Sequence, residues 1–136
     1  MGTKGQTRTY DFDGQLVVCS NVDRVVFPDD GITKGDVIEY YIDHADVLLP
    51  EIGERPLSIE RYTKGIAGGG FFQKHAQKHY PEWIERELLG IKTRVEYPII
   101  NSAAGLAYMA NQGAIAMHIW TSRRRKPDHP DMLVFD

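Results

Sequence analysis

The sequence predicts an α+β domain, an irregular α/β arrangement of a mixed sheet with flanking helices. Segments with the periods of strands and of helices follow one another without the regular strand–helix–strand repeat of a parallel fold. The chain has 136 residues, of which 42% are hydrophobic and 26% charged, so it can bury a core of its own. We therefore expect a single domain over residues 1–136, with a flexible tail at 1–7.

The N-terminal elements are predicted to be a hairpin followed by a short apolar strand. The segments 8–12 and 15–19 flank Asp13-Gly14, a dipeptide that favours a two-residue hairpin turn. A short apolar run then leads into a turn at residues 29–31, which are two aspartates and a glycine.

Two helices follow from apolar spacing. The first is predicted over 33–49, with Thr33 as its N-cap and Asp36 as the capping-box partner. Pro50 is expected to end it, because proline lacks the N–H that the helix needs. The second covers 101–111 and begins at an asparagine or serine that can cap it.

The remaining segments with strand character alternate apolar and polar residues or form short apolar runs. Strands are predicted at 56–62, 88–89, 93–100, 114–120 and 132–136. A glycine-rich loop separates the first of these strands from an aromatic pair at residues 71–72.

Composition excludes several classes of protein. The net charge of −3 does not by itself indicate a nucleic-acid binder. The chain has no apolar run long enough for a transmembrane helix and no secretory signal, so no membrane partner is expected. The single cysteine, Cys19, rules out an intramolecular disulfide, and a cytoplasmic location fits these features.

The start of the first helix is a candidate anion site. A helix N-terminus offers free N–H groups, and Lys34 and Thr33 add a charge and a hydroxyl there. Because a lysine is normally disfavoured at this end of a helix, its placement indicates a bound anion, with a solvated lysine as the alternative. Asn21 and Arg24 precede this helix and can converge on the same anion.

An aromatic pair and a histidine are further candidates. Adjacent side chains on a strand point to opposite faces, so one of Phe71 and Phe72 is expected in the core and the other in solvent. An exposed ring beside Lys74 is typical of a platform on which bases stack, whereas two core rings are the alternative. His118 is either a core histidine bonded to backbone or a donor that faces phosphate.

The C-terminal part of the chain offers a carboxylate and a basic block. Asp136 follows an apolar run, as a metal ligand at a sheet edge does, or it is a solvated chain end. One carboxylate cannot hold two metal ions, which need several convergent oxygens. The basic block at 123–126 is either a solvated loop or a strip that contacts nucleic-acid phosphates.

Taken in order, six segments resemble the polymerase domain of bacterial ATP-dependent DNA ligase D, a member of the archaeo-eukaryotic primase superfamily. The matching segments are 21–28, 31–36, 55–56, 70–74, 97–100 and 133–136. The resemblance runs from about residue 15 to the end. It implies that the chain is the N-terminal portion of a primase-polymerase fold.

The resemblance also implies a role in DNA repair by non-homologous end joining. Such domains hold the 5′-phosphate of a gapped or broken DNA end and extend the opposing 3′-hydroxyl along a template. They use Mn²⁺ or Mg²⁺ and nucleoside triphosphates, preferably ribonucleotides. The implied partners are 5′-phosphorylated DNA, Ku and a ligase module, and the implied location is the nucleoid.

The resemblance assigns roles to particular residues of this chain. The matching residues are Asn21, Arg24 and Lys34 for the 5′-phosphate, Phe71, Phe72 and Lys74 for the template, His118 for the nucleotide, and Asp136 for catalysis and metal binding. Arg24 stands where the family has a lysine, and it keeps the charge that phosphate binding needs. Asp136 matches the first aspartate of an Asp-x-Asp metal motif.

The family continues past the position of Asp136 to further metal ligands and nucleotide contacts. We therefore expect this chain alone to bind DNA ends but to have negligible polymerase activity. A non-catalytic module that binds DNA ends or recruits a partner is the alternative reading, and a degenerate fragment without activity is a third.

Overall fold

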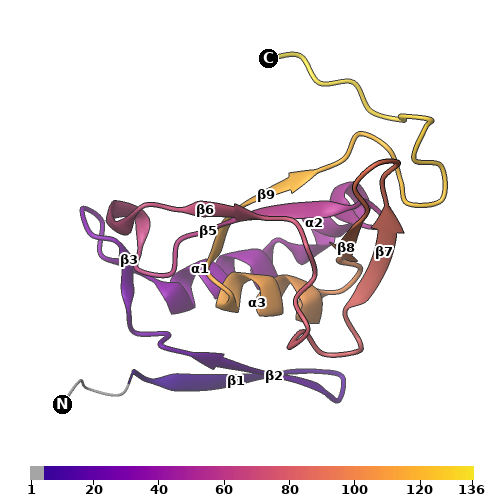
Figure 1. Ribbon diagram of the computed structural model, residues 1–136. Helices are drawn as coiled ribbons and strands as arrows, with labels where there is room; N and C mark the ends of the chain where they lie inside the picture. The colour runs from indigo at the N-terminus through magenta and orange to yellow at the C-terminus, as the bar shows by residue number, and fades with distance from the viewer. Residues whose placement is uncertain (1–4) are drawn as a thin grey trace.

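A computed structural model describes residues 5–136, and it confirms the α+β class (Figure 1). The helices α1 and α3 lie between the hairpin β1–β2 on one side and the sheet of β5, β6 and β9 on the other (Figure 1). The elements are β1 (Thr7–Phe12), β2 (Gln15–Ser20), β3 (Val25–Phe27), β4 (Ile32–Thr33), α1 (Lys34–Asp43), α2 (Ala45–Ile52), β5 (Leu57–Arg61), the 3-10 turn η1 (Ile66–Gly68), β6 (Phe71–Gln73), β7 (Glu85–Leu89), β8 (Val95–Ile99), α3 (Ala103–Asn111) and β9 (Ala114–Ile119).

In residues 5–136 the strands pair antiparallel in four small sheets, whereas the sequence predicted a mixed sheet. The largest has the order β6-β5-β9, with Ile59 of β5 opposite both Gln73 and Met117. Because alternate residues of a strand face opposite sides, Leu57 and Ile59 point toward the helices and are buried. The next inward position on β5 belongs to Arg61.

The hairpin is confirmed, and it extends into the expected tail. Asp13 and Gly14 have φ values of 51° and 98°, the left-handed conformation that a two-residue hairpin turn requires. Thr7 pairs with Ser20 in the ladder, and the Gln6 N–H donates to Asp23 at 2.8 Å. Thr7 is therefore part of β1 and Gln6 is bonded to Asp23, while residues 1–4 of the expected tail lie outside the described part of the chain.

The capping box at the first helix is confirmed, but the helix is shorter than predicted. The Asp36 N–H donates to the Thr33 hydroxyl at 3.2 Å, and the Thr33 N–H donates to the Asp36 carboxylate at 2.9 Å. The helix is interrupted at His44, which ends α1 and precedes α2, and α2 continues through Pro50 to Ile52. Pro50 does not end α2: it lies inside the helix, which continues to Ile52 without the one intrahelical hydrogen bond that the proline nitrogen cannot donate.

The helix α3 lies at the centre of the fold. Ser102 caps it by accepting a hydrogen bond from the Gly105 N–H at 3.1 Å. Leu106 and Met109 belong to the core cluster beneath the sheet, whereas Ala104 and Ala107 belong to the cluster against the hairpin. One helix therefore joins both cores and fixes the hairpin relative to the sheet.

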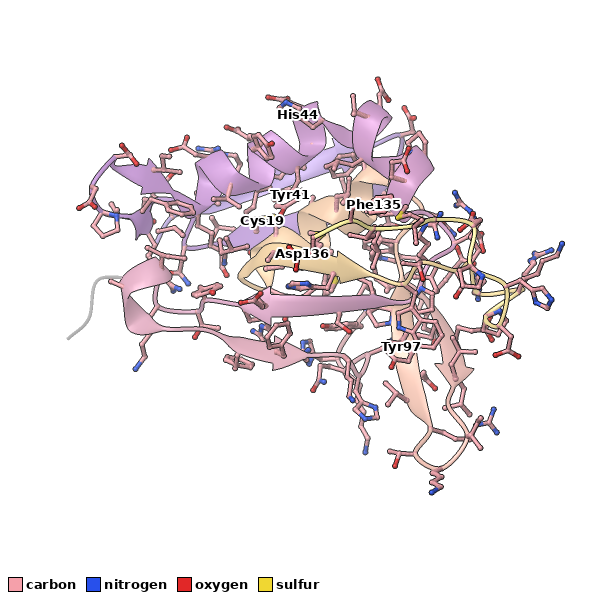
Figure 2. All side chains as sticks on the ribbon, turned by 90° about the horizontal axis from the view of Figure 1, so that it is seen from above. Cys19, Tyr41, His44, Tyr97, Phe135 and Asp136 are labelled. Carbon is pink, nitrogen blue, oxygen red and sulfur yellow. The ribbon has the colours of Figure 1, made fainter. Side chains whose placement is uncertain are left out.

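The prediction of a strand at residues 132–136 is wrong, because this segment is an irregular tail. No strand among the described residues pairs with it, and an extended segment without a partner leaves its backbone groups unpaired. Leu133 and Phe135 are 77% and 88% exposed. The tail rises away from the sheet in Figure 1 and passes over it in the perpendicular view of Figure 2, where Asp136 is labelled at its end.

Candidate functional site

A cationic cavity lies where the end of β5 meets the start of α1 and the end of α3. Its volume is about 170 Å³, and its lining includes Arg24, Lys34 and Arg61. The other described lining residues are apolar or uncharged, and none of them is acidic. A small space with three positive side chains and no lining carboxylate favours an anion.

Lys34 is the most enclosed of the three cations. It is only 8% exposed, and its ammonium donates to the Ser20 carbonyl at 2.7 Å. Burial, together with the nearby charges of Arg24 and Arg61, lowers the pKa of Lys34 to about 8. An anion in the cavity would offset both effects and favour the charged lysine.

The two arginines are held by uncharged acceptors. The Arg24 guanidinium donates to the Thr63 carbonyl. Arg61 donates from Nε to the Gln112 carbonyl at 2.5 Å and from Nη1 to the Gln73 side chain at 3.0 Å. Since carbonyl and amide acceptors orient a guanidinium without neutralising it, both positive charges remain available to an anion.

The backbone of α1 does not supply the free donors that the sequence indicated. The N–H of Lys34 donates to the Arg24 carbonyl and that of Gly35 to the Val22 carbonyl, each at 2.8 Å. The next N–H, of Asp36, is bonded to Thr33 in the capping box. The expectation that helix N–H groups hold the anion is therefore wrong, because the preceding loop and the capping box already use them. Any attraction of an anion to this cavity therefore comes from the side chains of Arg24, Lys34 and Arg61.

Asn21 is not among the residues that line this cavity. It has a left-handed φ of 54°, and its carbonyl accepts from the Arg24 N–H at 3.0 Å. Its side-chain oxygen fills the space that a Cβ would take at Gly5. Of the three residues expected to bind phosphate, the structure thus brings together Arg24 and Lys34, and Asn21 instead shapes the loop that carries Arg24.

Sequence reasoning missed Arg61 as a member of this site. The signal was present in the alternation of the strand, since Leu57, Ile59 and Arg61 occupy successive inward positions. An arginine at an inward position must find partners or line a cavity, and this one does both.

The opposite face of the same sheet carries an acid–base pair beside an aromatic ring. His118 Nε2 lies 2.7 Å from Glu60 Oε1, and the rings of His118 and Phe72 have centroids 5.1 Å apart. Hydrogen bonds from His118 and Tyr62 lower the pKa of Glu60. His118 is exposed and bonded to a carboxylate, so the alternative of a core histidine bonded to backbone is wrong.

Both rings of the aromatic pair are exposed, by 49% for Phe71 and 67% for Phe72. The expectation that one ring is in the core is wrong because β6 is a short edge strand. At the inward position Phe71 meets the Arg61 guanidinium, whose carbon lies 5.4 Å from the ring centroid. Lys74, just after β6, is also exposed.

The described carboxylates do not form a metal centre. Within residues 5–136, no group of three or more His, Cys, Asp or Glu side chains is placed to hold a metal ion. Asp136 is exposed at the end of the tail. These residues therefore do not fit a two-ion site, which needs several oxygens around the ions.

Comparison with known proteins identifies the family. Residues 33–136 match the family described as LigD, primase-polymerase domain. The chain belongs to this LigD family. It is 35% identical over 125 residues to the multifunctional non-homologous end joining protein LigD of Mycolicibacterium smegmatis. That match covers 90% of this chain and 16% of the relative. It is 30% identical over 118 residues to the Pseudomonas aeruginosa LigD, covering 86% of this chain and 14% of that protein.

A solved LigD structure shares the fold. The polymerase domain of Mycobacterium tuberculosis ligase D in complex with DNA matches with a TM-score of 0.77 and 36% identity, over 79% of this chain and 38% of that one. The resemblance to the ligase D polymerase domain is thus confirmed. The chain spans less than a fifth of the length of these LigD relatives.

The basic block of this LigD family member is divided by the fold. Arg123 bonds to Asp131 at 3.1 Å, and Arg124 bonds to Glu85 and Glu87, both at 2.9 Å. Residues 125 and 126 are exposed. The first half of the block is therefore part of an ion-pair network, and the second half faces solvent. In the described residues, none of the helices is long and apolar enough to cross a membrane.

Proposed function

We propose that this chain is the DNA-end-binding part of a non-homologous end-joining polymerase, and that its cationic cavity holds a 5′-phosphate. One observation carries the proposal: Arg24, Lys34 and Arg61 share a cavity without a lining carboxylate. Family membership supports the DNA-repair role, because the relatives are named as end-joining proteins and the M. tuberculosis domain is described in complex with DNA.

The chemistry of the cavity suits a terminal phosphate better than an internal one. A terminal 5′-phosphate carries between one and two negative charges near neutral pH and three acceptor oxygens, so it can meet several donors at once. Arginine offers a planar fork to two oxygens, whereas lysine acts as a point charge. A phosphodiester within the strand carries a single charge and would leave part of this cationic set uncompensated.

In the same proposal, the sheet presents the template and the nucleotide. The exposed rings of Phe71 and Phe72, next to Lys74, suit stacking of unpaired bases. The bond between Glu60 and His118 Nε2 leaves Nδ1 as the ring nitrogen for the triphosphate. We also propose a ligase module and Ku as partners in end joining at the nucleoid. The relatives are named as multifunctional or bifunctional non-homologous end joining proteins.

The test compares DNA ends that differ only in the phosphate. We expect the chain to bind a recessed duplex with a 5′-phosphate at least about tenfold more tightly than the same duplex with a 5′-hydroxyl, because charge-assisted hydrogen bonds contribute about 1.5–3 kcal/mol each. Lys34→Met should remove most of this preference. Lys92→Met, a change at an exposed lysine in the β7–β8 loop, is the matched control and should retain it.

Titration by fluorescence anisotropy at fixed salt measures both preferences. Equal affinity of the unaltered chain for the two ends would remove the proposal. So would a preference that the Lys34 and Lys92 variants lose to the same extent.

A further inference from the structure

Arg61 lies between the cationic cavity and the aromatic strand β6. It lines the cavity with Arg24 and Lys34, and in the β5–β6 ladder it is paired with Phe71. Its guanidinium carbon is 5.4 Å from the centroid of the Phe71 ring. A single side chain therefore touches both the space for the anion and the aromatic strand.

The hydrogen bonds of Arg61 extend this connection. Nη1 donates to the Gln73 side chain at 3.0 Å, and the Gln73 amide donates in turn to the Tyr80 hydroxyl at 2.8 Å. Tyr80 is 4% exposed and belongs to the main core cluster. Arg61 thus contacts both Phe71 and Gln73, the residues of β6 that face inward.

The same side chain closes the end of α3. Nε donates to the carbonyl of Gln112, the C-cap residue of that helix, at 2.5 Å. The negative end of a helix dipole disfavours a nearby anion, and this guanidinium offsets it. The two bonds use Nε and Nη1, and the described residues give Nη2 no acceptor.

We propose that Arg61 is a positioning residue that couples phosphate binding in the cavity to the placement of the template on β6. This inference rests on the proposed function and adds a link between its two ends. A phosphate that takes the open edge of the guanidinium restrains its plane, and the restrained plane fixes Gln73 and Phe71. Among the described strands, β6 is a short edge strand that pairs with β5 alone, so these side-chain contacts matter for its position.

The coupling has a measurable consequence in both directions. If a bound phosphate favours stacking of a template base, then a template base must raise the affinity for the phosphate by the same factor. Charge alone gives no such dependence. Arg24 serves as the comparison, because it lines the same cavity but its guanidinium bonds to the Thr63 carbonyl and not to β6.

The experiment uses four gapped duplexes, with a 5′-phosphate or a 5′-hydroxyl and with a normal or an abasic first template position. For the unaltered chain we expect the phosphate preference to be about fivefold or more larger when the base is present. Arg61→Lys keeps the charge but lacks the planar fork that bonds Gln112 and Gln73 from two separate nitrogens, so the phosphate preference should become about the same with and without the base. Arg24→Lys is the matched control and should retain it.

A second measurement uses the unaltered chain alone, with 2-aminopurine at the first template position. The 5′-phosphate should increase the quenching of this base. Equal quenching with both ends, a phosphate preference that ignores the template base, or equal loss in the two lysine variants would overturn the coupling. If the unaltered chain shows no phosphate preference on any duplex, the proposed function itself fails, which is a different result from loss of the dependence on the base.

Discussion

Two groups of basic residues in this chain have opposite electrostatic settings. Arg24, Lys34 and Arg61 come from distant parts of the sequence and share a cavity in which the described lining contains no acid. Arg123 and Arg124 belong to a continuous basic block, yet carboxylates neutralise them. The comparison teaches that density of charge along a sequence does not mark an anion site. The proposed anion site is instead marked by a lining that contains no carboxylate among the described residues.

Removing a neutralised arginine should cost stability and leave DNA discrimination intact. Arg124→Met leaves Glu85 and Glu87 without their partner, and it also removes the cation 3.6 Å from a buried oxygen of Glu54 that has no hydrogen bond among the described residues. We expect the free energy of unfolding to fall by about 2 kcal/mol, as measured in urea. A variant as stable as the parent would show that this network is not structural.

The cavity should respond to pH in a way that the ion-pair network does not. Because the pKa of Lys34 is about 8, its charge is present at pH 7 and largely absent at pH 9. A terminal phosphate titrates near pH 6 and stays doubly charged across this range. We therefore expect the preference for a 5′-phosphate to fall by up to about tenfold between pH 7 and pH 9.

Lys34→Arg is the control for this pH dependence, since arginine does not titrate in the range. The preference of that variant should stay level from pH 7 to pH 9. Folding lowers the pKa of Lys34. The folded protein therefore binds fewer protons than the unfolded protein between about pH 8 and pH 10.5. Lys34 should accordingly make the free energy of unfolding rise with pH across that window. An equally steep loss of preference in both proteins would assign the titration to another group.

The smallest effect is expected at the exposed half of the basic block. Arg125 and Lys126 are in solvent, where single charges contribute little to stability. The double change Arg125→Gln and Lys126→Gln should alter the free energy of unfolding by less than about 0.5 kcal/mol. It should also leave the ratio of affinities for phosphorylated and hydroxyl ends unchanged. A change in that ratio would place this loop near the DNA end and weaken the contrast between the two groups.

The features that could be predicted from the sequence are those that local chemistry decides. Asp13-Gly14 adopts the turn that its residues favour, and Thr33 with Asp36 forms the capping box. The start of the first helix predicts Lys34 and Arg24 as candidate anion ligands, the family resemblance assigns them to a 5′-phosphate, and the structure brings them together. The roles expected for the aromatic pair, His118 and Asp136 remain predictions.

The features that could not be predicted depend on contacts between distant segments. The break at His44 allows α2 to pack Ala45 and Ile52 into the core, which helical periodicity alone does not reveal. The last residues have strand composition but no partner strand among those described. Arg61 becomes a site residue only because α3 ends beside it at Gln112.

The alternation of β5 has a consequence for insertions and deletions. Glu60 and Arg61 are neighbours in sequence, but they serve the acid–base pair on one face and the cationic cavity on the other. A shift of this strand by one residue turns every side chain to the other face: in one direction Glu60 takes the cavity position of Arg61, and in the other Arg61 takes the position of Glu60 beside His118. Either shift would reverse the charge on one surface and remove the charged residue of β5 from the other. Segments before β5 can therefore vary in length only where the loops absorb the change, while the pairing of Arg61 with Phe71 keeps its frame.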